Sequence, residues 1–461
     1  MISETICIII VTSFLMGLAS CEIRFAFEMF RHGARAPIVL KENNRDILNE
    51  YWNMDQELTA VGMRQHYLIG YRNRKNYMNF LSNSFDPNEM YVISTNSNRT
   101  IMSAYSQLQG LYPNGTGPEL TLFQQATAFP PIDDVDYTLE IGRLGKNTFP
   151  NRAAVFPIHN FGDNSRYFGL NHPNVCPAMK ELEGNNLKKK LLKDFMDKFV
   201  SYYGDALMKI LNVTVDYFYK YQNIWEITDA FICDYTDGRE LKMLKDANID
   251  LVEFNKTIYE FLYLDIMEIA SGDKDNLMGL VSMSPTGLDI LKWMQGRINN
   301  DKNNVGYQGY NSPKFVMYSG HDTNMGLMQY YLKQTLKFKN VYLTPFASSI
   351  FFELHRNLNY DPSNFGEDDY YVMIRYNNEY NTKISFKDFK KGISENSYNY
   401  DQIAAFCKFK DDLRDHSRFF IFATFIFGFI ALALIIFIGY TVYRNKRNND
   451  DNTPKKFYDT V

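Results

Sequence analysis

The chain has 461 residues, a formal net charge of −4, 45% hydrophobic residues, 16% aromatic residues and 5 cysteines. The absence of a basic excess argues against nucleic acid as a partner, and the apolar and aromatic content argues against a largely disordered chain. Such a chain can bury a large core. Its few cysteines exclude a small scaffold held together by disulfides.

An apolar run at residues 6–19 lies close to the N-terminus and ends in small residues, which is typical of a secretory signal peptide. We expect residues 1–20 to be this leader, although Glu4 stands where a basic residue is usual. A buried strand or helix is the alternative, because the run is too short to span a membrane.

A second apolar stretch, residues 419–443, contains no charged residue. At about 1.5 Å per residue, a helix of this length exceeds the roughly 30 Å hydrocarbon core of a bilayer, so we predict one transmembrane helix. Basic residues flank it on both sides, and the leader must therefore decide the orientation. With the leader cleaved, the protein is single-pass type I, with a luminal or extracellular ectodomain, a stem at 411–418 and a cytosolic tail at 444–461.

Three segments of the ectodomain share one plan, in which a short apolar strand leads through a polar turn into a helix. The strands are expected at 24–30, 90–95 and 315–319. Further strands are expected at 348–354 and 370–376. Strands that alternate with helices predict an α/β fold, with a mostly parallel sheet covered by helices on both faces.

The stretch between the second and third of these units has a mainly helical pattern. Apolar residues recur at helical spacing over 187–200, 252–269 and 286–298. We therefore expect a helical insertion, the cap, at 130–299. The α/β domain is then formed by 21–129 and 300–410.

Four Asn-x-Ser/Thr triplets are potential acceptors for N-glycosylation of an exported chain. We expect glycans at Asn114, Asn212 and Asn255. The fourth triplet begins at Asn98, and the residue that follows, Arg99, is assigned below to a substrate crevice. We therefore expect Asn98 to be unmodified.

The first strand runs directly into the sequence R-H-G-A-R-A-P at 31–37. The planar guanidinium of arginine binds two phosphate oxygens in parallel, and neutral imidazole is a nucleophile near physiological pH. A histidine flanked by arginines is suited to attack a bound phosphoryl group and form a covalent phosphohistidine. We therefore predict His32 as the nucleophile.

The two later strands end in groups that can stabilise charge and donate a proton. Arg99 lies at the start of a helix, where backbone N–H groups also favour an anion, and Asp322 follows the third strand. Because the carboxyl ends of strands form the ligand crevice of an open α/β sheet, these motifs should meet in one site. Asp322 is the predicted general acid. The predicted phosphate-binding groups are Arg31, Arg35, Arg99 and His321.

Each of these features alone has an ordinary explanation, such as a surface turn, a helix N-cap or a helical arginine. Their occurrence at three successive strand ends favours a shared function. The other histidines show no metal-ligand spacing and are expected to be structural or surface groups. They are His66, His159, His172, His355 and His416.

These motifs resemble those of the histidine acid phosphatases, a branch of the phosphoglycerate-mutase-like superfamily. The matching segments are 31–37, 58–65, 94–104 and 318–324. The resemblance implies a two-step phosphohistidine mechanism, no metal cofactor and an acidic pH optimum. It also implies a disulfide between Cys176 and Cys407, which leaves Cys233 without an assigned partner.

The ends of the chain resemble the membrane-bound, lysosomal-type acid phosphatases, which have a leader, a catalytic ectodomain, one span and a short tail. Tyr458 begins a Tyr-x-x-apolar pattern of the kind that sorting adaptors read, although so short a pattern also arises by chance. Both the lysosomal membrane and the plasma membrane fit this plan. The expected partners are a small phosphomonoester substrate, the membrane and a second copy in a homodimer, and not nucleic acid.

The leading hypothesis is an acid phosphatase that acts on phosphate monoesters. A phytase or inositol polyphosphate phosphatase is the alternative enzyme, because such relatives share both motifs, but Ile38 is closer to the acid phosphatases. An inactive cell-surface binding protein with the same fold is the alternative of another class. The presence of every charged group of the mechanism argues against it.

Overall fold

The computed structural model describes residues 21–38, 56–132, 135–160, 176, 178, 190–239, 241–271, 277–339, 341–377, 379–407, 434 and 437–441. The predicted leader, the stem, most of the predicted membrane helix and the tail with Tyr458 lie outside the described residues, as do His172 and His416. Contacts divide the chain into two compact units, Met1–Ile403 and Ala404–Val461.

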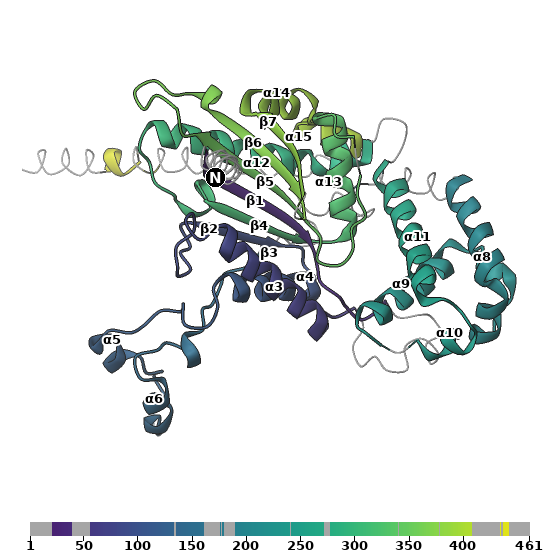
Figure 1. Cartoon of the computed structure of the whole chain (residues 1–461). Coiled ribbons are helices and arrows are strands. Elements are labelled where there is room, and N and C mark those ends of the chain that lie inside the picture. The colour runs from purple at the N-terminus through teal and green to yellow at the C-terminus, as the bar shows by residue number, and fades with distance from the viewer. Residues whose placement is uncertain are drawn as a thin grey trace, which may run out of the picture. The chain divides into compact units, whose positions relative to one another are not determined.

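The first unit is built on a seven-stranded sheet of order β3-β2-β4-β1-β5-β6-β7 (Figure 1). The strands are β1 (Cys21–Arg31), β2 (Met90–Ser94), β3 (His159–Asn160), β4 (Phe315–Gly320), β5 (Ser349–Asn357), β6 (Tyr370–Tyr376) and β7 (Glu379–Ser385). The α/β class is confirmed. The expected mostly parallel arrangement is wrong, because only the half from β3 to β1 is parallel, and β1, β5, β6 and β7 pair antiparallel.

The three strands that carry the sequence motifs are neighbours in the parallel half. β1 pairs with β4 so that Arg31 lies opposite Gly320, and β2 pairs with β4 so that Ser94 lies opposite Ser319. Their carboxyl ends therefore lie side by side at one edge of the sheet, where an α/β fold forms its ligand crevice.

The chain also forms helices, and most of these lie close to the sheet or pack in a separate helical group (Figure 1). They are α3 (Ala60–Asn76), α4 (Asn98–Leu111), α5 (Leu122–Thr127), α6 (Thr138–Leu144), α8 (Lys190–Leu211), α9 (Tyr221–Thr236), α10 (Lys242–Asp246), α11 (Leu251–Ser271), α12 (Leu277–Lys302), α13 (Asp322–Thr335), α14 (Phe386–Asn396) and α15 (Tyr400–Cys407).

Alternate side chains of β1 face two different helical layers, as expected for a strand buried on both faces. Phe27 lies against Trp293 of α12, with ring centroids 6.4 Å apart. Phe30, on the opposite face, belongs to a buried cluster with Ala104 and Leu108 of α4. Helices α3 and α4 thus cover one face of the sheet, and α12 covers the other (Figure 1).

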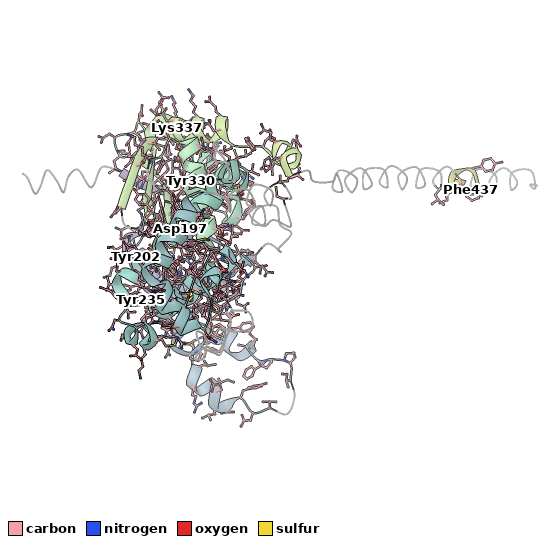
Figure 2. All side chains as sticks on the ribbon, turned by 90° about the vertical axis from the view of Figure 1, so that its right-hand side faces the viewer. Asp197, Tyr202, Tyr235, Tyr330, Lys337 and Phe437 are labelled. Carbon is pink, nitrogen blue, oxygen red and sulfur yellow. The ribbon has the colours of Figure 1, made fainter. Side chains whose placement is uncertain are left out.

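Helices α8 to α11 form the helical group and pack around a second apolar cluster, in which Phe199, Phe254 and Phe261 are buried. The same cluster contains Ala34 and Phe346, so this core reaches the turn that follows β1. Figure 2 shows this side of the unit, with Asp197, Tyr202 and Tyr235 labelled. The predicted cap boundary at 299 falls inside α12, which lies on the sheet.

The second unit has few described residues after α15. Among them, Phe437, labelled in Figure 2, and Ile438 are 64% and 57% exposed. Within the described part of the chain, no helix has the length and apolar content that a membrane crossing requires. The predicted span at 419–443 lies mostly outside that part and stays a prediction.

The disulfide expectation concerns three cysteines. Cys176 and Cys407 are each disulfide-bonded, which agrees with the pairing implied by the resemblance. Cys233 is a free thiol buried in α9.

Candidate active site

The backbone of Arg31 and His32 is held by β4 and by the segment that precedes β5. The His32 N–H donates to the Gly320 carbonyl at 3.0 Å, and the His32 carbonyl accepts from the Ala347 N–H at 3.1 Å. The Arg31 N–H donates to the Ser348 carbonyl at 2.9 Å. The His32 side chain, 2% exposed, is therefore presented from a fixed strand end.

The start of α3 supports the turn that follows His32. The Ala34 N–H donates to Gln65 Oε1 at 2.9 Å, and the Ala34 carbonyl accepts from the Thr59 N–H at 2.9 Å. A Cβ atom on Gly62 would lie 2.2 Å from the Ala34 carbonyl oxygen, so this close approach requires glycine. The motif at 58–65 thus acts by holding the loop.

The orientation of the His32 ring is set by the backbone of the next residue. Nδ1 lies 2.9 Å from the carbonyl oxygen of Gly33. A carbonyl can only accept, so Nδ1 carries the proton and Nε2 keeps its lone pair. Burial, followed by the positive neighbours, lowers the pKa of His32 well below its ordinary value, so the imidazole stays neutral in acid. The neighbours that lower it are Arg31, His321, Arg35 and Arg99.

Each of three arginines at the site has one guanidinium N–H group without a hydrogen-bond partner. Arg31 donates through Nη1 to the Thr344 carbonyl at 2.6 Å, and Arg99 donates through Nη1 to Gln56 Oε1 at 3.4 Å. The Nε atoms of Arg31, Arg35 and Arg99 are all buried and have no hydrogen-bond partner. A buried N–H without a partner is costly, and an anion at this site would satisfy it.

Arg35 is fixed by a carboxylate from the helical group. Its Nη2 and Nη1 donate to the two oxygens of Asp229 in α9, at 2.6 and 3.1 Å. The second oxygen of Asp229 also accepts the Ile38 N–H at 2.9 Å. Despite burial, the charge of Asp229 raises the pKa of Arg35 above its ordinary value. Sequence reasoning missed Asp229, and the signal it offers is an acidic residue on a fully buried stretch of helix.

Asp322 lies at the start of α13 and forms an ion pair with Arg31, with 2.7 Å between Oδ2 and Nη2. Burial raises the pKa of this carboxyl, but the charges of Arg31 and Arg35 outweigh burial, and its pKa lies below the ordinary value. Its side chain remains 24% exposed, so it faces the open side of the site.

His321 is the N-cap residue of α13, and its backbone N–H donates to Asn324 Oδ1 at 2.9 Å. Its ring lies 5.4 Å from that of His32, between centroids, and Nε2 is 3.0 Å from Thr95 Oγ1. Burial and then the charge of Arg99 lower the pKa of His321 to about 3. Thr95, which sequence reasoning listed only within a matching segment, therefore orients this ring.

The six predicted site residues thus gather at the ends of β1, β2 and β4, and the three arginines among them carry the positive charge that acts on His32. Phe346, which was not predicted, lies under Arg31, with the guanidinium carbon 4.2 Å from its ring centroid. Among the residues that the structure describes, no group of three or more His, Cys, Asp or Glu side chains could hold a metal ion.

The remaining described histidines have other environments. His66 is buried between helices and hydrogen-bonded at both ring nitrogens. His159 is exposed on β3 and stacks on Tyr91, at 4.8 Å between centroids. His355 lies 3.1 Å from Glu353, whose pKa falls to about 2 because the partners of this carboxylate outweigh its burial.

The predicted glycosylation sites differ in accessibility. Asn114 and Asn212 are exposed in turns. Asn255 lies within α11, and its Oδ1 atom is buried without a hydrogen-bond partner. Asn98 is exposed, and its amide donates to Glu57 at 2.8 Å.

The sequence and the fold both have known relatives. The chain is 27% identical to prostatic acid phosphatase of Bos taurus over 367 residues, which cover 79% of each chain. It is 28% identical to lysosomal acid phosphatase of Xenopus laevis, over 75% of this chain and 68% of the relative.

Among solved structures, a Klebsiella phytase has a TM-score of 0.53 at 13% identity, over 82% of this chain and 96% of that one. A Hafnia alvei phytase in complex with myo-inositol hexakis sulphate has a TM-score of 0.53 at 13% identity, over 83% and 99%. At this identity the likeness concerns the fold alone.

A family model described as "Histidine phosphatase superfamily (branch 2)" matches residues 22–377, which include every group gathered at the three strand ends. The matched segment comprises most of the chain. With a neutral histidine held among three arginines at the end of β1, the chain belongs to branch 2 of the histidine phosphatase superfamily.

Proposed function

We propose that this protein is an acid phosphatase that hydrolyses phosphate monoesters through a covalent phosphohistidine at His32. One observation carries the proposal. A neutral imidazole with a free Nε2 lone pair is surrounded by three arginines, each with a buried N–H group that lacks a partner. The printed names of the relatives, prostatic and lysosomal acid phosphatase, support the substrate class.

In the first step, the phosphate oxygens accept hydrogen bonds from the arginines and from His321, which disperses the charge that develops in the transition state. The lone pair of His32 Nε2 attacks phosphorus, and the bond between phosphorus and the ester oxygen breaks. Asp322 donates its proton to the departing oxygen, so the leaving group departs as a neutral alcohol.

Asp322 must gain this proton before it can act as an acid. In the free protein its carboxylate pairs with Arg31, which favours the ionised form. A bound phosphate brings negative charge to Arg31 and competes for its N–H groups, so substrate binding raises the pKa of Asp322. In the second step, the carboxylate accepts a proton from water, the water oxygen attacks phosphorus, and the phosphorus–nitrogen bond to His32 breaks.

The proposal extends to the rest of the chain as expected from the sequence. The helical group α8 to α11 shapes the space for the leaving group, because Asp229 of α9 already holds Arg35. The helix at 419–443 anchors the enzyme as a single-pass type I protein of the lysosomal or plasma membrane. The lysosomal name among the relatives supports the first location, and Tyr458 would serve sorting. A homodimer is part of the same proposal.

The test is hydrolysis by the full chain in a non-ionic detergent, between about pH 4 and 7 and with a chelator present. Aryl phosphate, nucleotide and phytate are compared side by side, because phytate hydrolysis separates the alternative enzyme from the leading one. His32→Ala should lower kcat by about a thousandfold or more, whereas His159→Ala, an exposed histidine on β3, should leave kcat unchanged.

Labelled phosphate should be trapped on wild-type protein as an acid-labile, base-stable adduct at position 32. Wild-type inactivity toward every substrate would instead favour a binding protein with this fold. Equal activity of His32→Ala and wild type would overturn the proposed nucleophile.

A further inference from the structure

Buried polar side chains lie beneath the site, between β1, α3 and α4. Oε2 of Glu28, in the middle of β1, accepts from the amide of Asn73 at 2.9 Å and from the amide of Gln107 at 2.7 Å. Its other oxygen accepts from the Ser349 hydroxyl at 3.1 Å. The side chain of Glu28 is fully buried, although no part of the reaction uses it.

The same amide connects Glu28 to the catalytic turn. Gln107 Oε1 lies 2.9 Å from Nδ1 of His66, and Nε2 of His66 lies 3.2 Å from the carbonyl oxygen of Arg31. That carbonyl belongs to the same peptide group as the His32 N–H, which is bonded to Gly320. His66 therefore fixes one side of the peptide that aims His32, and β4 fixes the other.

The hydrogen bonds of this chain require a definite number of protons. A carbonyl only accepts, so Nε2 of His66 carries a proton. In the orientation described above, the Gln107 oxygen faces Nδ1 of His66, so Nδ1 must carry a proton too. His66 is then doubly protonated, and Glu28 is a carboxylate. If the Gln107 amide is turned, it donates to Nδ1 of a neutral His66, and its oxygen then needs a proton from Glu28.

Both orientations satisfy every bond, and in both the pair of Glu28 and His66 holds one proton more than a carboxylate with a neutral imidazole. Removal of that proton leaves two acceptors facing each other somewhere between Glu28 and the Arg31 carbonyl. An unpaired polar contact of this kind, in a fully buried place, is costly.

We propose that Glu28 and His66 share one proton through the Gln107 amide, and that this proton keeps His66 bonded to the Arg31 carbonyl. Both are then positioning residues for His32, and this consequence for turnover rests on the function proposed above. The sharing of the proton does not depend on that function.

The surroundings favour Glu28 as the carrier of the proton in acid. Burial raises the pKa of Glu28 to about 7, although Gln107, Arg375 and Ser349 oppose the rise. Burial lowers the pKa of His66 to about 4, against its hydrogen bonds to Gln107 and to the Arg31 carbonyl. The charged groups that act on Glu28 are Arg375 of β6 and Arg72 of α3.

The unfolded chain also holds one proton on this pair over much of the acidic range, because a free imidazole is protonated and a free carboxyl is ionised between about pH 4.5 and 6.5. Folding therefore moves the proton from His66 to Glu28 without changing the number bound. The pair should therefore contribute almost no pH dependence to the free energy of unfolding of the wild type in this range.

Single substitutions at positions 28 and 66 should make the unfolding equilibrium constant depend on pH in opposite directions. In Glu28→Gln only His66 titrates, and the unfolded chain binds a proton that the folded chain refuses. The unfolding equilibrium constant should then rise by up to about tenfold for each pH unit of acidification, relative to wild type. In His66→Gln only Glu28 titrates, and the folded chain keeps a proton that the unfolded chain releases. The constant should rise by a similar factor for each pH unit in the alkaline direction.

The measurement is urea unfolding of the full chain in detergent, followed by tryptophan fluorescence, to which Trp293, packed on β1, contributes. The double variant should regain the wild-type slope. Ser349→Ala is the matched control, because it removes a hydrogen bond to Glu28 and no titrating group. Slopes equal to wild type in both single variants, or a changed slope in only one of them, would overturn the proposal.

Turnover gives a second readout. Gln at position 66 can offer an amide N–H to the Arg31 carbonyl, so His66→Gln should keep kcat in acid within about twofold of wild type. His66→Leu lacks the donor and should lower kcat about tenfold per folded molecule, with KM little changed. Equal kcat in both variants would contradict the positioning role, whereas wild-type inactivity would contradict the proposed function and leave the slopes to decide the proton sharing.

Discussion

The groups around His32 combine two demands that normally conflict. A nucleophile must stay unprotonated in acid, and a phosphate site must be positive. Here burial and positive charge both depress the pKa of His32, so the same arginines that attract the anion also keep the imidazole ready to attack. The charge of Arg31 also lowers the pKa of Asp322. This carboxyl therefore stays ionised, and cannot donate a proton, until a phosphate binds.

The general-acid role of Asp322 predicts a dependence on the leaving group. Asp322→Asn cannot donate a proton, so kcat/KM for alkyl phosphates should fall by about a hundredfold or more. For an aryl phosphate whose phenolate leaves without help, the loss should be less than about tenfold. The measurement is kcat/KM across a series of leaving groups for both proteins.

Asp361→Asn, a change at an exposed carboxylate in the loop after β5, serves as the control for this series and should follow the wild-type line. Equal losses for good and poor leaving groups in Asp322→Asn would assign Asp322 to phosphate-site electrostatics and not to proton transfer.

At the scale of elements, the sequence predicted what local pattern encodes and missed what depends on distant pairing. The expected strand at 370–376 coincides with β6, and the motif-bearing strands match β1, β2 and β4. The two-residue β3 has too little pattern to be detected, and the antiparallel half of the sheet was missed because strand direction is set by connections and not by alternation.

The site shows the same limit. Arg31, His32 and Arg35 share one motif, so sequence reading found them together. Asp229 lies in another element, and only folding brings it to Arg35. Local sequence shows that its helix is apolar, but it does not show which arginine an acid on that helix will meet.

The pairing of α9 with the catalytic loop predicts that Asp229 contributes to both stability and activity. Asp229→Asn removes the charge that balances Arg35, where both side chains are nearly fully buried. Breaking a buried ion pair on one side should lower the free energy of unfolding by about 3 kcal/mol or more. It should also lower kcat/KM, because Arg35 is no longer aimed at the site. Urea unfolding and steady-state kinetics on the same samples provide the measurement.

Glu260→Gln provides the comparison within the helical group, because it breaks the exposed pair between α11 and Lys198 of α8. Exposed pairs contribute less than about 1 kcal/mol, so this variant should resemble wild type. A loss in Asp229→Asn no larger than that in Glu260→Gln would show that the link between α9 and the loop is not important for either property.

At the scale of the whole molecule, the net charge of −4 gives no sign of an anion site, because the positive groups are concentrated at three strand ends. The negative total charge and the positive site are compatible, because each site arginine is either paired with a carboxylate or partly buried. Export and membrane attachment are inferred from hydropathy, from charge and from the resemblance to membrane-bound acid phosphatases. Their test must therefore report which side of the membrane the ectodomain occupies.

Glycans provide that test, because they are added only to segments that reach the lumen. If the protein is type I, Asn114 and Asn212, which are exposed in turns, should carry glycans when the full chain is expressed in a eukaryotic secretory pathway. Asn255 should be occupied least of the three expected sites, because its Oδ1 atom is buried in α11.

Glycopeptide mapping before and after enzymatic deglycosylation is the measurement, with Asn114→Gln and Asn212→Gln each removing one glycan. Asn98→Gln should remove no glycan, since Asn98 bonds to Glu57 and adjoins Arg99 at the site. A glycan at Asn98 would contradict either this expectation or the role of Arg99. A chain that is retained in membranes after alkaline extraction, yet carries no glycan at any of the expected sites, would mean that the ectodomain does not enter the lumen. The type I orientation would then be wrong even if the enzyme is active.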